Sequence, residues 1–84
     1  MDTLTPPILG SLIQRTRKAQ GLRQDELAGV ANVGIRFIVD LESGKPTVQL
    51  GKVLQVLAAL GCQVSIVPPP DADLPLGPDR RGRP

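Results

Sequence analysis

The sequence predicts a small all-α domain of four to five short helices, closed by one C-terminal β-strand. Apolar residues recur at helical spacing in four separate segments, and each segment is followed by a residue that favours helix termination, namely Gly21, Asn32, Gly44 or Gly61. Only residues 62–67 alternate in the manner of a strand. The chain has 84 residues, which is enough for one small domain.

The first helix is expected from about Ile8 to Gln20. Pro6 and Pro7 come before it, and proline is well accommodated in a first helical turn. Helical spacing places one set of residues on a common face: Leu9, Leu12, Ile13, Thr16 and Ala19. Residues 1–7 are therefore interpreted as an N-terminal extension, and Gly21 as the end of the helix.

Two shorter helices follow, about Gln24–Val30 and Gly34–Ser43, with a three-residue turn between them. The second helix begins with Asp25 and Glu26, whose negative charges suit the positive end of a helix dipole. Asn32 lies in the turn, and asparagine tolerates the left-handed conformation better than other non-glycine residues. Helices this short are not stable alone. Together they predict a helix-turn-helix.

A fourth helix is expected from about Gln49 to Leu60, because Pro46 prevents continuation of the third. Val56 lies on a different side from its other apolar residues, which are predicted to face the core: Leu50, Val53, Leu54, Leu57 and Leu60. This arrangement leaves more apolar surface than one small core needs.

Residues 62–67, with the sequence CQVSIV, are predicted to form the strand. An isolated strand is not stable, and no second strand pattern occurs in the chain. The simplest partner is the same strand of a second protomer, so we expect a homodimer. Its interface is expected to contain Val56, Cys62, Val64 and Ile66. The domain therefore spans residues 8–67, and the proline-rich residues 68–84 are interpreted as a disordered tail.

Composition argues against several functions. The chain has no histidine and no glycine-rich phosphate loop, so the catalytic arrangements that pair His with Ser or Cys cannot form. Its single cysteine cannot make an internal disulfide, and no metal or cofactor site is indicated. No apolar run approaches the roughly 20 residues that span a bilayer. We expect a cytoplasmic, non-enzymatic protein without a cofactor or a membrane partner.

Cations are concentrated beside the predicted helix-turn-helix. Residues 14–23 contain four of them and no acid: Arg15, Arg17, Lys18 and Arg23. On the third helix, Ile38 and Leu41 define a buried direction at 100° per residue, and Arg36 and Asp40 point away from it. Arginine can bond bidentately to guanine, and a carboxylate can accept from the amino group of cytosine. Alternatively, Arg36 and Asp40 form an i,i+4 surface ion pair.

The chain contains GLRQDELAGVANVGIRFIVDLESGKP, which resembles the helix-turn-helix domain of the phage-repressor/Cro (XRE) family. The run RFIVDLESGKPTVQLGKVLQVLAALG, followed by one strand, is most similar to HipB-type antitoxins. Those are DNA-binding partners of HipA-like serine/threonine kinase toxins. The resemblance covers about Leu9 to Val67.

The resemblance implies a role for individual positions. Base edges would be approached by Gly34, Ile35, Arg36 and Asp40. DNA phosphates would be contacted by Arg23, Gln24 and Lys45. A buried ion pair between the first and third helices would be formed by Arg17 and Glu42.

The predicted function is that of a transcriptional repressor that binds double-stranded DNA in a sequence-specific manner. Two recognition helices of the homodimer would enter successive major grooves, about 34 Å apart, on a pseudo-palindromic operator. The protein would repress its own operon and bind a HipA-like kinase toxin. Two alternatives stay open: a stand-alone XRE-type regulator without a toxin, and a protein-docking module with residual DNA affinity. Salt-dependent DNA binding separates the docking module from the repressor.

Overall fold

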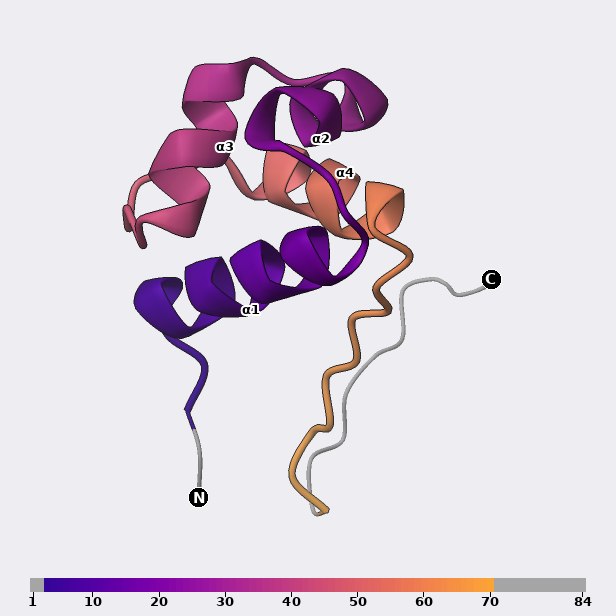
Figure 1. Ribbon diagram of the computed structural model, residues 1–84. Coiled ribbons are helices and arrows are strands. Elements are labelled where there is room, and N and C mark those ends of the chain that lie inside the picture. Colours follow the sequence, from indigo (N-terminus) through magenta and orange to yellow (C-terminus); the bar gives the residue numbers. More distant parts are fainter. Residues whose placement is uncertain (1–2, 71–84) are drawn as a thin grey trace, which may run out of the picture.

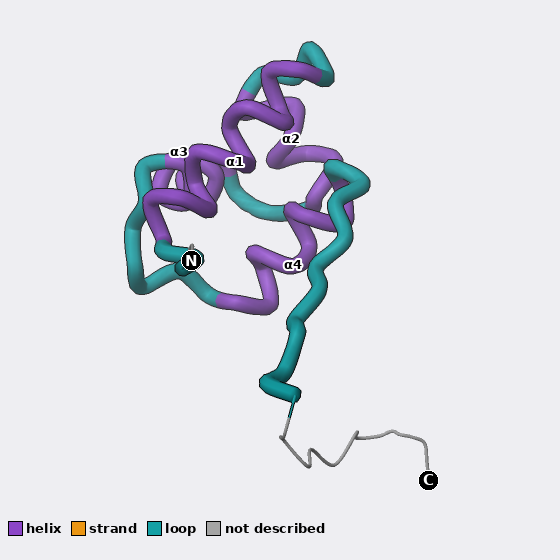
Figure 2. The backbone as a smooth tube through the Cα atoms, turned by 90° about the horizontal axis from the view of Figure 1, so that it is seen from below, coloured by secondary structure: helices purple, strands orange, loops and turns teal. Residues whose placement is uncertain are grey.

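The computed structural model describes residues 3–70, which form four helices joined by short loops (Figure 1). The helices are α1 (Pro6–Ala19), α2 (Gln24–Ala31), α3 (Ile35–Glu42) and α4 (Leu50–Ala59). Each boundary lies within two residues of the one expected from sequence, and the all-α helix-turn-helix class is confirmed. Viewed from below, the four helices surround a common centre (Figure 2).

The start of α1 differs from the expectation. The Oγ1 of Thr5 accepts a hydrogen bond of 3.3 Å from the backbone N–H of Ile8, so Thr5 is the N-cap and the helix begins at Pro6 rather than Ile8. Gly44 fixes the loop after α3 against this end of α1. Its φ of +88° favours glycine, and an added Cβ would lie 2.9 Å from the Cα of Pro7.

The turn between α2 and α3 forms as the sequence predicted. Asn32 has φ 59° and ψ 46°, the left-handed conformation, and it ends α2. The next backbone N–H, that of Val33, donates to the carbonyl of Ala28 at 3.0 Å. This bond satisfies a carbonyl at the end of α2, and the left-handed Asn32 redirects the chain into α3.

Each helix contributes one large, fully buried side chain to the core: Ile13, Leu27, Ile38 and Val56. Smaller or slightly more accessible apolar residues complete the core: Ala28, Ala31, Leu41, Val53 and Leu60. Phe37 is half-buried and packs against this cluster. The core is thin and aliphatic, so helix orientation depends on a small number of contacts.

The position of Val56 corrects the sequence interpretation. Its side chain is 0% exposed within the single chain, so the expectation that it lies at a dimer interface is wrong. Leu50 and Leu54, expected in the core, are 69% and 45% exposed. Because α4 is apolar on nearly all sides, spacing alone does not select its buried face. Packing into the common core selects Val53 and Val56 instead.

Residues 62–69 leave the helices as a segment without regular secondary structure (Figure 1). Val64, Ile66 and Val67 are 58%, 87% and 86% exposed. The predicted strand does not occur within residues 3–70 of one chain, and a strand requires a pairing partner. Its pairing across a dimer stays a prediction. Residues 71–84 of the predicted tail lie outside the described residues. None of the helices within residues 3–70 is both long and apolar enough to cross a bilayer.

Candidate nucleic-acid interface

The second helix of the helix-turn-helix, α3, is held on one side and open to solvent on the other. Ile38 and Leu41 are 0% and 2% exposed, and α3 packs against α1 and α2. On the opposite side the Arg36 side chain is 85% exposed. Gly34, the N-cap, is also exposed, and Ile35 is 50% exposed. These three predicted base-contacting residues therefore lie together at the exposed start of α3.

Asp40 joins two cations on this open side. Its Oδ1 lies 3.7 Å from the Nε of Arg36, and its Oδ2 lies 3.5 Å from the Nζ of Lys45. The i,i+4 surface pair considered from sequence is therefore present. Long pairs at the protein surface contribute less than about 1 kcal/mol each to stability. These contacts therefore orient side chains more than they stabilise the fold. We call Asp40, Arg36 and Lys45 the Asp40 cluster.

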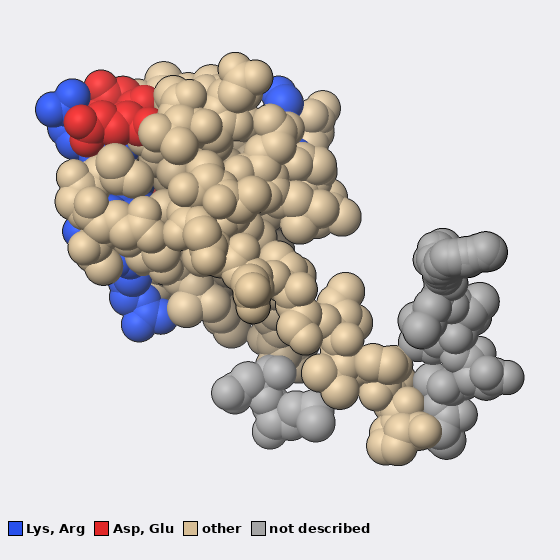
Figure 3. Space-filling view, turned by 90° about the vertical axis from the view of Figure 1, so that its right-hand side faces the viewer, with Lys and Arg blue, Asp and Glu red and all other residues tan. Residues whose placement is uncertain are grey.

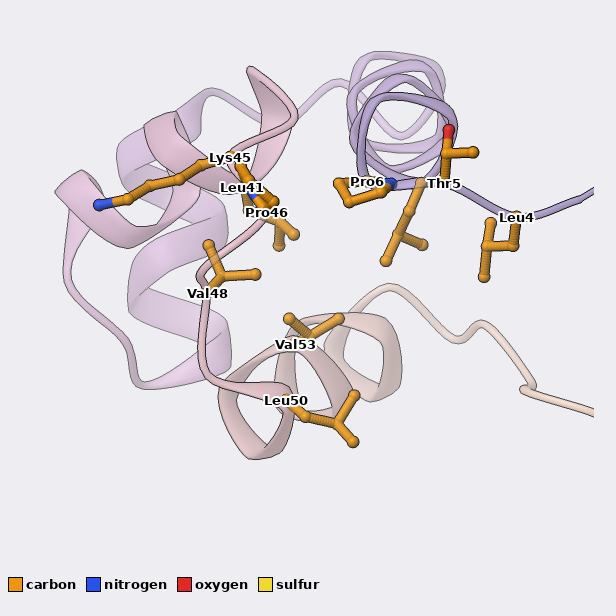
Figure 4. Close-up of a pocket in the computed structure, with 10 residues that line it drawn as sticks. Leu4, Thr5, Pro6, Leu41, Lys45, Pro46, Val48, Leu50 and Val53 are labelled. Atoms are coloured by element: carbon orange, nitrogen blue, oxygen red, sulfur yellow. The ribbon is translucent and has the colours of Figure 1, made fainter.

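The ammonium of Lys45 belongs to the exposed surface. Lys45 lies at the edge of an apolar cavity of about 240 Å³, which is bounded by the start of α1, the loop after α3, and α4. Figure 4 shows that the Lys45 side chain extends away from the apolar side chains that line this cavity, such as Val48 and Val53. Its charge therefore lies at the surface beside α3, where it pairs with Asp40.

A buried ion pair fixes the other end of α3. The Nε of Arg17 lies 2.6 Å from Oε2 of Glu42, and its Nη2 donates to Oε1 at 3.0 Å. The two side chains are only 8% and 2% exposed. The Nη1 of Arg17 also donates to the carbonyl of Leu22 at 2.8 Å. The pair implied by the family resemblance is thus present, and the hydrogen bond to Glu42 raises the pKa of Arg17.

Gln24 makes a contact that the sequence did not predict. Its Nε2 donates to the Oε1 of Glu42 at 3.1 Å, so the first residue of α2 joins the ion pair between α1 and α3. The two residues are separated by 18 positions, and no local spacing rule relates them. Only the packing of α2 against α3 brings them together. We call Arg17, Gln24 and Glu42 the Glu42 cluster.

Arg23 is the N-cap of α2, and its side chain is 74% exposed. Its backbone N–H donates to Oε1 of Glu26 at 2.8 Å, which is one half of a capping box. Its guanidinium lies 3.1 Å from Oδ1 of Asp25, and this hydrogen bond lowers the pKa of Asp25. The Arg23 charge is therefore partly compensated in the free protein.

Lys52 of α4 is a further cation near α3 that the sequence did not indicate. Its Nζ lies 5.8 Å from the centre of the Phe37 ring, within the range of a cation–π contact. Within residues 3–70, no group of three or more Cys, His, Asp or Glu side chains is placed to hold a metal ion. The cations near the open side of α3 are therefore Arg36, Lys45 and Lys52, with Asp40 between the first two.

Comparison with known proteins identifies the class. Residues 13–67 match the helix-turn-helix family, and the chain belongs to that family. Over 65 residues the chain is 66% identical to a protein of Sinorhizobium fredii (strain NBRC 101917 / NGR234) named uncharacterized HTH-type transcriptional regulator y4mF. That alignment covers 77% of this chain and 86% of the relative.

Solved structures share the fold. A chain of the HipA-HipB-O2-O3 complex superposes with a TM-score of 0.73 at 19% identity, covering 81% of this chain and 96% of that one. A chain of the HipB-O4 20mer complex superposes with a TM-score of 0.72, also at 19% identity and with the same coverage. At this identity the similarity concerns the fold.

Proposed function

We propose that this protein is a sequence-specific DNA-binding transcriptional repressor whose recognition helix is α3. The observation that carries this proposal is the exposed Arg36 side chain at the start of a helix whose opposite face is anchored by Ile38 and Leu41. A helix held in this way can enter the major groove without unpacking the domain. There the Arg36 guanidinium would bond to the N7 and O6 of a guanine. Gly34 and Ile35 would lie beside the same base edges.

Phosphate contacts would position α3 in the groove. Arg23 and Gln24 lie at the start of α2, and Lys45 lies in the loop after α3. The Gln24 amide nitrogen uses one hydrogen for Glu42, so its second hydrogen would be oriented toward a phosphate. Contacts of this kind set register and affinity but carry no sequence information.

The proposed repressor is a homodimer, formed by pairing of residues 62–67 from two protomers. An apolar groove of about 410 Å³ lies between α1 and α4 and is bordered by this segment. Leu12 and Leu54 line it and are 44% and 45% exposed. The side from which residues 62–70 leave has its charged side chains mainly at the margins (Figure 3). A second copy would bury Leu12, Leu54, Val64 and Ile66, with Cys62 at the start of the paired strand.

We further propose that the protein is a HipB-like antitoxin that represses its own operon and binds a HipA-like kinase toxin. Support comes from the run of residues 36–61, which resembles HipB-type antitoxins, and from the fold shared with chains of HipB complexes. The alternative is a stand-alone regulator. It is favoured by the 66% identical relative, which is named as a transcriptional regulator.

The first experiment measures fluorescence anisotropy of the pure protein on its own promoter fragment and on a scrambled fragment, each at low and high salt. We expect a preference for the promoter fragment that persists as salt rises, because base contacts depend less on counterion release than phosphate contacts do. Weak and equal binding to both fragments would overturn the repressor proposal. It would favour a docking module with residual charge-driven affinity.

Partner proposals need separate measurements. Deletion of residues 62–67 should convert a dimer to a monomer in light scattering after size exclusion, and a surviving dimer would refute strand pairing. Co-expression with a HipA-like kinase encoded beside this gene should yield a stable complex. A chromosome without such a neighbour, or a kinase that never co-purifies, would favour the stand-alone regulator.

A further inference from the structure

We propose that Asp40 determines specificity by positioning Arg36 and by penalising binding to DNA of arbitrary sequence. This inference rests on the proposed function of α3 as a recognition helix. It replaces the expectation that Asp40 accepts a hydrogen bond from a cytosine. Asp40 uses one carboxylate oxygen for each of two cations, Arg36 and Lys45.

The contact atoms leave the reading end of Arg36 available. The closest approach joins Oδ1 of Asp40 to the Nε of Arg36 at 3.7 Å, and no hydrogen bond from a terminal nitrogen of this guanidinium forms within residues 3–70. Those terminal nitrogens are the pair that can bond to guanine. An 85% exposed Arg36 side chain that approaches Asp40 through Nε would keep its terminal nitrogens accessible to a base edge. Guanine recognition and the Asp40 contact are compatible.

Binding to a phosphate is affected differently. On DNA of arbitrary sequence, Arg36 and Lys45 would gain only phosphate contacts, and each phosphate would compete with Asp40 for the same cation. Asp40 itself repels the phosphates. Its side chain is 26% exposed, so its charge is less screened by water than that of the 85% exposed Arg36. The carboxylate therefore weakens non-specific binding more than specific binding, which raises the ratio between them.

No other acid in residues 3–70 has this position. Glu42 is 2% exposed and bonded to Arg17, while Asp25 and Glu26 surround Arg23 at the start of α2. Asp40 is the acid on the open side of α3, between one predicted base contact and one predicted phosphate contact. The Asp40 cluster thus combines a proposed base contact, Arg36, and a proposed phosphate contact, Lys45, with a negative charge that opposes the binding of either cation to DNA of arbitrary sequence.

The test is Asp40→Asn in the full chain, with affinity measured on the promoter fragment and on the scrambled fragment over a salt series. Affinity for scrambled DNA should rise roughly tenfold, with a log–log salt slope steeper by about 1. Affinity for the promoter fragment should change less than about threefold, so the specificity ratio should fall by at least about threefold. Asp73→Asn makes the same change in net charge and should leave the ratio unchanged.

Three results would overturn the proposal. An equal gain in affinity on both fragments would mean that Asp40 acts only by general charge repulsion. Weaker promoter binding with no gain on scrambled DNA would make Asp40 a base-reading residue. A ratio that falls by as much when Asp40→Asn is introduced into Arg36→Ala as it does in the wild-type protein would show that positioning of Arg36 is not involved. Failure of the proposed function itself would give a different result, because the wild-type protein would then show no preference for its promoter fragment.

Discussion

Two acidic residues near the end of α3 have similar chemistry and very different surroundings. Glu42 is 2% exposed, bonded twice by Arg17 at 2.6 and 3.0 Å and once by Gln24 at 3.1 Å. Asp40, two positions earlier, is 26% exposed and lies 3.5 and 3.7 Å from its two cations. Burial and geometry, rather than residue type, decide what each acid contributes.

The location of the partners completes the contrast. Both partners of Glu42 belong to other helices, Arg17 to α1 and Gln24 to α2, so the Glu42 cluster fixes α3 relative to the rest of the domain. The partners of Asp40 lie on α3 itself and in the loop that follows it. The Asp40 cluster connects no two helices. We infer that the Glu42 cluster serves stability and the Asp40 cluster serves binding.

The largest effect is expected from Glu42→Ala, which leaves the buried Arg17 without its partner. Breaking a buried pair from one side costs about 3–5 kcal/mol. Urea unfolding followed by circular dichroism should show this loss in the free energy of unfolding. Arg17→Ala should cost a similar amount, whereas replacing both residues by methionine should cost less than either change alone. A loss below about 1 kcal/mol for Glu42→Ala would contradict the structural role of the pair.

The next effect concerns how closely α1 approaches this end of α3. A Cβ added to Gly10 would lie 2.4 Å from the carbonyl oxygen of Leu41 and 2.8 Å from that of Glu42. Gly10→Ala should therefore destabilise the domain by about 1–3 kcal/mol, because two backbones must separate. Gly29→Ala is the matched control within a helix, since its Cβ would meet nothing within 4 Å. That change should stabilise by about 0.5–1 kcal/mol. Equal effects of the two substitutions in thermal unfolding would refute the close approach.

Local signals predicted the fold well. Glycine at position 44 and asparagine at position 32 end their helices with positive φ, as expected, because helix ends are decided by a few neighbouring residues. The buried face of α4 was not predictable in the same way. Both Val56 and Leu54 are apolar, and only packing against the other helices exposes one and buries the other.

Contacts in the candidate site were predictable from the sequence only where the two residues are close in the chain or where the family resemblance implies the contact. The Arg36–Asp40 pair follows from i,i+4 spacing. The Arg17–Glu42 pair joins residues 25 positions apart and was anticipated through the family resemblance, not from spacing. The bond from Gln24 to Glu42 and the contact from Lys45 to Asp40 depend on side-chain rotamers within the folded domain. Composition and periodicity do not specify rotamers.

A smaller effect, on DNA binding, should separate the two cations of the Asp40 cluster. Arg36→Ala should reduce discrimination between operator and scrambled DNA by about 1–3 kcal/mol, because a base contact is lost. Lys45→Ala should weaken binding to both fragments alike and lower the salt slope by about 1. Both residues are exposed, so unfolding midpoints should not move. Equal losses on the two fragments for Arg36→Ala would remove its base-reading role.

The smallest effect is expected from Asp40→Ala on stability, and it decides whether the contrast between the clusters holds. Its ion pairs are long and solvent-accessible, and exposed pairs of this kind contribute about 0–1 kcal/mol each. Any loss in the free energy of unfolding caused by Asp40→Ala should disappear in about 1 M salt, where charges are screened within about 3 Å. The larger loss in Glu42→Ala should persist there, because buried pairs are screened much less. Urea unfolding of both variants at low and high salt measures this. A salt-resistant loss in Asp40→Ala as large as that in Glu42→Ala would mean that the exposed cluster also supports the fold.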